Sequence, residues 1–459
     1  MVETRKYPYV EKLRTASREE LLEVIAAQQA QIEELLARVG ALEEELRRLR
    51  AGKGGGTPLA VKPSRPDREK KERKHRDRSF VRRREQPTEL RYHAVECCPD
   101  CGWKLEGGWE HRRRQVIQIE LPPVRVIDHV IMARRCGACG KRWLPKLTDK
   151  DLGVQGKRRL GVSVQALVAT LHIGCRVPMT MIRRMLGEMF GLRISQGEVV
   201  ELLDGTREAG KEAIGELLER VRGSPAVCGD ETGWRQDGDN GYLWTFATPT
   251  VRYFLYRKSR SGQVPKEVLG EEFGGVVACD FYAGYNKLGV LQRCWFHLLK
   301  DAKELAEINA DRPETVAWVE ALGALYEEAK AVASACAELP ADCRARRKQR
   351  RRLEKLAVQL ARPYAEDANA PQRVLAKRIM KHRHELFVFI SDPAVPATNN
   401  LAERSLRPAV VARKISGGTR SPKGSETKMG LMSLFGTWTV QGKPLLASCR
   451  QLLLPTHTT

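Results

Sequence analysis

The sequence lacks any long apolar run, and none approaches the about 20 residues that a membrane-spanning helix needs. The first residues, MVETRKYPYVEKLR, also lack the apolar core of a secretory signal peptide. The 12 cysteines do not form a disulfide framework, because four fall into two C-x-x-C pairs and the others are scattered. We therefore expect no membrane partner and a reducing, cytoplasmic setting.

Acidic residues are few relative to basic ones, since 57 Asp and Glu stand against 80 Lys and Arg, a formal charge of +23. An excess of this size favours a polyanionic partner, because each Lys or Arg that meets a phosphate releases a counterion. The apolar share of 42% is enough for folded cores, and 459 residues suggest several domains. The composition predicts a multidomain protein that binds nucleic acid.

Residues 17–50 follow a heptad pattern. Position a holds Ile25, Ile32, Val39 and Leu46, and position d holds Leu21, Gln28, Leu35, Leu42 and Leu49. Branched residues at a with Leu at d favour a parallel two-stranded coiled coil, in which a polar residue such as Gln28 fixes the register. The pattern predicts a zipper that makes a homodimer or higher oligomer; a helix packed on its own protein is the alternative.

Residues 51–90 read as a basic flexible linker. AGKGGGTP is rich in glycine, and KPSRPDREKKERKHRDRSFVRRRE combines many Arg and Lys with few apolar residues. Two interpretations stay open: a solvated tether, or a segment that contacts DNA phosphates.

Residues 91–145 contain a candidate zinc ribbon. The ligands are two C-x-x-C knuckles, each followed by glycine: Cys98, Cys101, Cys136 and Cys139. A spacing of two residues lets both sulfurs of a knuckle face one ion, and two knuckles complete a tetrahedral thiolate site for Zn²⁺. The segment between them reads as strand, Pro-Pro turn, strand. Cys97 competes with Cys98 as a ligand, and four unligated core cysteines are the alternative.

Residues 155–222 read as a helical domain. Pro178 begins a helix that Gly191 ends, and Ser195 caps the next one. A helix, a short glycine turn and a capped helix form the outline of a helix-turn-helix, although any helical hairpin has it too. We expect a DNA-binding domain.

From residue 224 the pattern changes to strands, as expected for an α/β catalytic core. Three strands, a helix and a fourth strand follow in the order of an RNase H-like sheet, and residues 224–300 form its first part. Asp230 lies in the first strand and Asp280 ends the fourth, which neighbours the first in that fold. Residues 301–390 are a helical insertion, and 391–459 hold the second part of the core and the tail. The expected fold is multidomain α+β.

Carboxylates that meet on one sheet suit a divalent ion such as Mg²⁺, because hard cations prefer oxygen ligands. Phosphoryl transfer in DNA needs such ions at the attacking and leaving oxygens. Glu403 lies on a later helix that could close the group from the side. Glu231 and Asp237 are nearby competitors.

Several ordered motifs resemble transposases of the insertion-sequence-66 family over essentially the whole chain. They are DETGW at 230–234, CDFYAGY at 279–285, CWFH at 294–297, NNLAERSLRP at 399–408 and the pair Arg413-Lys414. A departure is Cys228, where many relatives are expected to carry a polar residue.

The resemblance implies a metal-dependent DNA transposase that cleaves transposon ends and joins them to target DNA in a prokaryotic cytoplasm. Its catalytic carboxylates are Asp230, Asp280 and Glu403, with Mg²⁺ or Mn²⁺ as cofactor. His297, Arg404 and Arg407 match motif positions and are assigned to support of the phosphates or the active site.

Asn399 and Asn400 begin the helix of Glu403, where an amide side chain caps well; a catalytic role is equally open. Two other functions remain. An inactive or domesticated DNA-binding protein would not need the carboxylates, and a stand-alone nuclease would not need the zipper.

Overall fold

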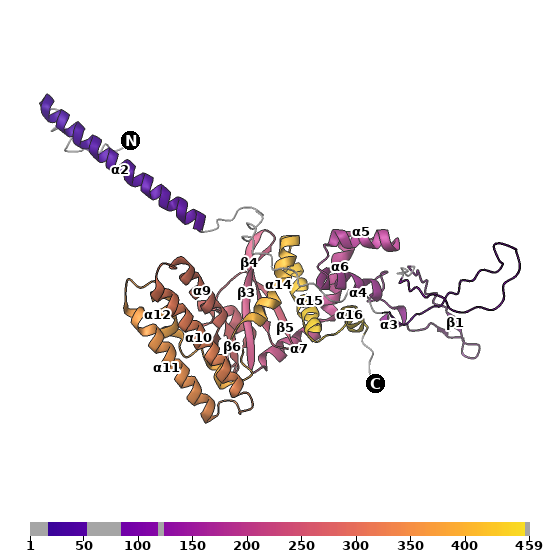
Figure 1. Cartoon of the computed structure of the whole chain (residues 1–459). Coiled ribbons are helices and arrows are strands. Elements are labelled where there is room, and N and C mark those ends of the chain that lie inside the picture. The colour runs from indigo at the N-terminus through magenta and orange to yellow at the C-terminus, as the bar shows by residue number, and fades with distance from the viewer. Residues whose placement is uncertain (1–16, 53–83, 118–123, 455–459) are drawn as a thin grey trace. The chain divides into compact units, whose positions relative to one another are not determined.

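The computed structural model describes residues 17–52, 84–117 and 124–454 (Figure 1). The chain divides into two units, Met1–Ile117 and Gln118–Thr459. Most of the basic linker and the Pro122-Pro123 turn lie outside the described residues. The described helices include none long and apolar enough to cross a membrane.

In the N-terminal unit, α2 (Arg18–Gly52) covers the predicted zipper. Four of its apolar heptad residues, Ile25, Ile32, Leu35 and Val39, are each at least half exposed. The same unit holds the first knuckle, a tight turn in which Gly102 N–H donates to the Cys98 carbonyl at 2.9 Å. Gly102 has φ +74°, a conformation that favours glycine.

The second knuckle, in the C-terminal unit, lies between the short strands β1 (Arg134–Arg135) and β2 (Arg142–Trp143). They pair in antiparallel fashion, and Gly140 N–H donates to the Cys136 carbonyl at 2.9 Å. The predicted hairpin between the knuckles is wrong in its described part, because 115–117 and 124–133 carry no strand. Side chains there are mostly exposed, and strands with no buried face gain little.

Four helices after a short α3 (Asp149–Leu152) form the segment before the sheet. They are α4 (Val162–Ala169), which continues as the π-helix η1 (Thr170–Gly174), α5 (Met179–Phe190), α6 (Gln196–Ala209) and α7 (Lys211–Arg222). The predicted boundaries at Pro178, Gly191 and Ser195 are confirmed. Gly191 ends α5 with φ +67°, and Ser195 and Glu198 form a capping box at the start of α6.

The central sheet has five strands in the order β5-β4-β3-β6-β7. They are β3 (Ala226–Gln236), β4 (Asp239–Ala247), β5 (Arg252–Arg257), β6 (Val276–Cys279) and β7 (Val290–Arg293). The first three strands are antiparallel, whereas β6 pairs in parallel with β3 and β7 with β6. The predicted adjacency of the first and fourth strands is therefore confirmed. Helix α8 (Gln263–Leu269) and the 3-10 turn η2 (Ala283–Tyr285) complete the connections.

A group of helices lies beside the β6–β7 edge of the sheet (Figure 1). They are α9 (Trp295–Ile308), α10 (Pro313–Ala335), α11 (Arg344–Glu366), α12 (Arg373–His382) and α13 (Val388–Ser391). Their own core includes the buried Trp295, Leu322 and Leu353. The predicted helical character of this stretch is confirmed.

The chain then returns to the sheet with α14 (Asn400–Ser416), α15 (Pro422–Val440) and α16 (Leu445–Leu453). Helix α14 packs on β3 and β4, and α15 packs on β5. Buried residues of α14 and α15 join the core that also contains Trp234 and Trp244 of the sheet. The architecture is thus mixed α+β, with a helix from the C-terminal part lying along the central strand.

Candidate active site

Asp230 and Asp280 lie at equivalent positions of two neighbouring strands. Strands β3 and β6 pair in parallel with Cys228 opposite Ala278, and each aspartate follows two residues later. Parallel neighbours keep this register, so both residues come to the same edge of the pair. Asp230 remains in β3 opposite Thr245 of β4, whereas Asp280 is the first residue after β6.

Helix α14 carries Glu403 to the same strand. Near its C-terminal end, the Arg413 guanidinium donates to Thr232 Oγ1 at 3.2 Å and to the Gly233 carbonyl. At its N-terminal end, the Asn399 side chain donates to the Gly229 carbonyl at 2.9 Å. The helix is therefore tied to β3 on both sides of Asp230, with Glu403 in its first turn.

Asn399 does not cap the helix with its side chain, which corrects the capping interpretation. Asn399 is fully buried, and its Nδ2 group donates a hydrogen bond to the carbonyl of Gly229, the residue directly before Asp230. Its backbone carbonyl accepts from Glu403 N–H at 3.2 Å. Asn399 therefore joins the strand of one candidate carboxylate to the helix of another. Asn400, by contrast, is exposed.

Burial and neighbouring carboxylates both act on the pKa of Asp230. Burial, together with the charges of Glu231, Asp280 and Glu403, raises the pKa of Asp230 to about 7 against the backbone hydrogen bond from Glu231. Within the described residues, neither Asp230, Asp280 nor Glu403 forms an ion pair with Lys or Arg. The charges of Asp280 and Glu403 thus reach Asp230, although the three carboxylates are not among the described groups whose donor atoms all lie within 4.8 Å of one another.

The raised pKa makes a prediction for stability without metal. Folded Asp230 holds its proton up to pH about 7, whereas the unfolded group has lost it above its ordinary pKa of 3.8. The stabilisation is complete below the lower value and is lost as pH rises through the higher one, so the free energy of unfolding should fall by up to about 4 kcal/mol over the whole range. Urea unfolding in EDTA at pH 5 and pH 8 measures the part of this fall above pH 5, about 2–3 kcal/mol. Asp230→Asn should remove most of it, and an equal fall in that variant would contradict the assignment.

Glu231 is occupied by partners of its own. The Arg260 guanidinium lies 2.7 Å from Oε1, and the Tyr285 hydroxyl donates to Oε2 at 2.8 Å. The Glu231 side chain is only 2% exposed. The competitor Asp237 is exposed in the β3–β4 turn. Glu231 is thus paired with Arg260, and Asp237 is exposed, whereas Asp230 is largely buried and forms no ion pair with Lys or Arg among the described residues.

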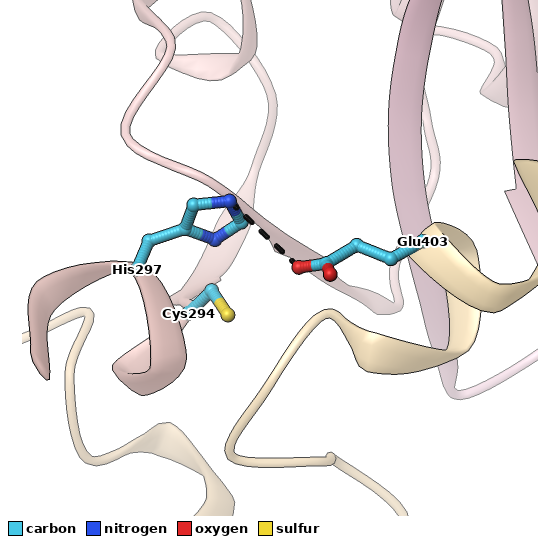
Figure 2. Close-up of side chains that lie close together, drawn as sticks. All are labelled: Cys294, His297 and Glu403. Atoms are coloured by element: carbon cyan, nitrogen blue, oxygen red, sulfur yellow. Dashed lines mark ion pairs between the residues drawn. The ribbon is translucent and has the colours of Figure 1, made fainter. Parts of the chain in front are cut away.

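His297 and Cys294 come from the start of α9 and face Glu403 (Figure 2). His297 Nε2 lies 3.7 Å from Glu403 Oε1. Among the residues that the structure describes, these three form the one group of potential metal ligands whose donor atoms all lie within 4.8 Å of one another. The predicted supporting residue His297 therefore lies beside Glu403, whereas no role was predicted for Cys294.

Arg404 and Arg407 are exposed on α14, beside and one turn after Glu403. No hydrogen bond or ion pair of their side chains is found with the rest of the described chain. Their guanidinium groups are therefore available to a ligand at this surface.

The cysteine knuckles lie apart from this site in the sequence. Hydrogen bonds from the backbone of Cys101 and Asp100 lower the pKa of Cys98, and those from Cys139 and Ala138 lower the pKa of Cys136. Amides that point at sulfur favour the thiolate form that binds metal. The knuckles fall in different units of the structure, so their meeting on one ion stays a prediction.

A protein-family model matches the part of the chain that holds this site. The model of the "Transposase IS66 family" matches residues 157–427, more than half of the chain. The chain belongs to the IS66 transposase family. The IS66 match spans the helical segment, the sheet and α14, and therefore all of Asp230, Asp280, His297 and Glu403.

A curated relative also resembles this IS66 chain. It is "Uncharacterized protein y4jD" of Sinorhizobium fredii (strain NBRC 101917 / NGR234), which is 24% identical over 287 residues. The aligned part is 55% of this chain. The chain spans about half of the relative's length, 54%.

Proposed function

We propose that the chain is a DNA transposase that cleaves transposon ends and joins them to target DNA at Asp230, Asp280 and Glu403. The observation that carries the proposal is the convergence of two aspartates from neighbouring parallel strands with a helix that is tied to one of those strands. The strand order, with three antiparallel strands followed by parallel neighbours, supports an RNase H-like core. Membership of the IS66 family supports the reaction.

The residues present fit a hard divalent cation. The Asp230 pKa of about 7 reflects buried, mutually repelling carboxylates, and Glu403 Oε1 is a buried oxygen with no hydrogen-bond partner. Asp230, Asp280 and Glu403 would hold Mg²⁺ or Mn²⁺ through oxygen ligands. When bound, such ions activate the attacking oxygen and stabilise the leaving oxygen of a phosphoryl transfer.

The remaining side chains have distinct tasks in this proposal. Arg260 and Tyr285 hold Glu231 away from the ligand set, because both of its oxygens are already bound. Arg413 and Asn399 fix Glu403's helix on β3. Arg404 and Arg407, exposed on that helix, contact DNA phosphates through charged hydrogen bonds.

The test is cleavage of duplex DNA that carries the sequences flanking this gene. The purified chain should release 3′-hydroxyl ends in Mg²⁺ and join them to a plasmid, EDTA should stop both steps, and added Mn²⁺ should restore them. Specific binding of the ends without cleavage in either metal would contradict the enzyme and favour the DNA-binding protein.

The cysteine knuckles are proposed to hold one structural Zn²⁺ through Cys98, Cys101, Cys136 and Cys139. Support comes from the two matching turns, each with amides directed at the first sulfur and a glycine at positive φ. Cys98→Ser should lose about one equivalent of zinc, measured by elemental analysis, because metal binding and folding are coupled. Cys97→Ser is the matched control, and loss in Cys97→Ser alone would make Cys97 the ligand.

Helix α2 is proposed to pair with a second copy of the chain. Its heptad residues Ile25, Ile32 and Val39 are exposed within one chain and would be buried in a parallel zipper. Ile32→Asp should convert the oligomer to monomer in sedimentation experiments, since it places a charge in the seam. Ala37→Asp, at the outer heptad position f, is the control. An unchanged oligomer in Ile32→Asp would contradict the zipper.

A further inference from the structure

Three side-chain atoms at or next to the proposed magnesium site are buried without a hydrogen-bond partner. They are Oε1 of Glu403, Nδ1 of His297 and Oδ1 of Asn399. Buried polar atoms are normally satisfied by protein, water or an ion, and Glu403 Oε1 is the one that faces the other ring nitrogen of His297, Nε2. The distance of 3.7 Å between His297 Nε2 and Glu403 Oε1 is too long for a hydrogen bond between them.

Cys294 completes the group. It immediately precedes α9, and His297 lies on the first turn, so both point from one helix end towards Glu403 (Figure 2). The Cys294 thiol is fully buried, and its sulfur accepts from Asn399 N–H at 3.1 Å. Backbone N–H groups of Phe296 and His297 also bond to it. Burial nevertheless raises the pKa of the Cys294 thiol against these hydrogen bonds, so a cation would have to displace the thiol proton.

We propose that Cys294, His297 and Glu403 form a second cation site, for a borderline transition metal such as Zn²⁺, that shares Glu403 with the magnesium site. Thiolate and imidazole ligands select zinc-like ions, whereas magnesium takes oxygen ligands almost alone. Three protein ligands leave a fourth tetrahedral position open.

The spacing of the donor atoms fits this cation. With metal–ligand bonds of about 2.0–2.3 Å, tetrahedral ligand atoms lie about 3.3–3.8 Å apart. The distance from His297 Nε2 to Glu403 Oε1, 3.7 Å, is already in this range, and one ligand atom from each of the three residues lies within 4.8 Å of the other two. Closing the site therefore takes movements of about 1 Å or less, within the reach of side-chain rotation. The arriving ion takes the place of the thiol proton, which is released to solvent.

Sharing Glu403 has a consequence for catalysis, which rests on the proposed function. A zinc-like ion on Cys294 and His297 withdraws the Glu403 carboxylate from Asp230 and Asp280. Zinc should therefore inhibit Mg²⁺-dependent cleavage, and Cys294→Ser should raise the half-inhibiting concentration by about tenfold or more. Each protein is compared with its own rate in zinc-free buffer.

Binding itself is tested with Co²⁺ on the full chain, without DNA or magnesium. Equilibrium dialysis and thiolate–cobalt charge-transfer absorption should show about one equivalent fewer in Cys294→Ser than in the natural chain. Cys449→Ser changes another fully buried cysteine, in α16, and should bind as the natural chain does. Equal stoichiometry and absorption in Cys294→Ser would overturn the site.

A second variant tests the site in case Cys294→Ser does not fold. His297 is one-third exposed, so His297→Ala should fold and weaken cobalt binding at this site by about tenfold or more. Unchanged binding there would also overturn the proposal, leaving His297 only to orient Glu403. A chain that binds cobalt in this way but cleaves no DNA keeps the site and loses the proposed function. The reverse outcome keeps the function and loses the site.

Discussion

Asp230→Asn is expected to reduce Mg²⁺-dependent cleavage of DNA ends by about a thousandfold or more, equivalent to about 4 kcal/mol of transition-state stabilisation. The substitution keeps the size of the side chain but removes the charge at the centre of the carboxylate group. Asp230 is the residue whose pKa responds to Glu231, Asp280 and Glu403 together, so its oxygens lie where these fields meet. Cleavage is followed on end-labelled duplexes, with end binding measured in parallel.

The control is Asp237→Asn, an exposed residue of the β3–β4 turn that should leave cleavage unchanged. Glu403→Gln should lose activity as Asp230→Asn does, while both variants keep their affinity for DNA ends. Because Asp230→Asn also relieves repulsion, it should be more stable than the natural chain at pH 8 without metal. Full activity in either Asp230→Asn or Glu403→Gln would remove that residue from the catalytic set.

The positions of Asp230 and Asp280 could be predicted because each depends on a local pattern. A buried apolar run that ends in an aspartate marks a strand, and the order of strands and helix predicts which strands become neighbours. The observed pairing of Cys228 with Ala278 confirms that inference. Glu403 could not be found in this way, since one glutamate on an amphipathic helix resembles any other. The NNLAERSLRP motif singled it out.

Contacts made across long sequence distances were beyond prediction. Asn399 looked like a helix cap, but its side chain reaches Gly229, 170 residues away. A capping interaction is local and has a sequence signature, whereas this one depends on where α14 docks on the sheet. Glu231 likewise looked like a free competitor until Arg260 and Tyr285 were seen to occupy it.

Cys294 was not predicted as a ligand for a different reason. The sequence contains the visible pair Cys294-Trp-Phe-His297, yet a metal group with Glu403 needs a third ligand more than 100 residues away. A signal was present, because a cysteine at a helix start with a histidine three residues later directs both side chains to one end. The predicted hairpin between the knuckles erred the other way, because the described residues 115–117 and 124–133 are mostly exposed and carry no strand.

Arg293→Met should lower the free energy of unfolding by about 3–5 kcal/mol, the usual cost of breaking a buried charged network. The Arg293 side chain is fully buried at the end of β7, and methionine keeps much of its apolar volume. Its guanidinium donates to the Asp280 carbonyl at 2.7 Å and to Glu385 Oε2 at 2.6 Å. It therefore joins the loop that presents Asp280 to the end of the helical insertion. Urea denaturation at about pH 7.5 measures this loss of stability.

The matched control for Arg293→Met is Arg352→Met on α11, whose ion pair with Glu328 is nearly half exposed on both sides. An exposed pair contributes about 1 kcal/mol or less, so this variant should unfold almost as the natural chain does. Arg293→Lys keeps the charge without the planar fork and should restore only part of the stability. Because the Asp280 carbonyl loses its donor, Arg293→Met should also slow cleavage under conditions where it remains folded. Equal stability of the Arg293 and Arg352 variants would mean that the insertion is not held to the Asp280 loop through Arg293.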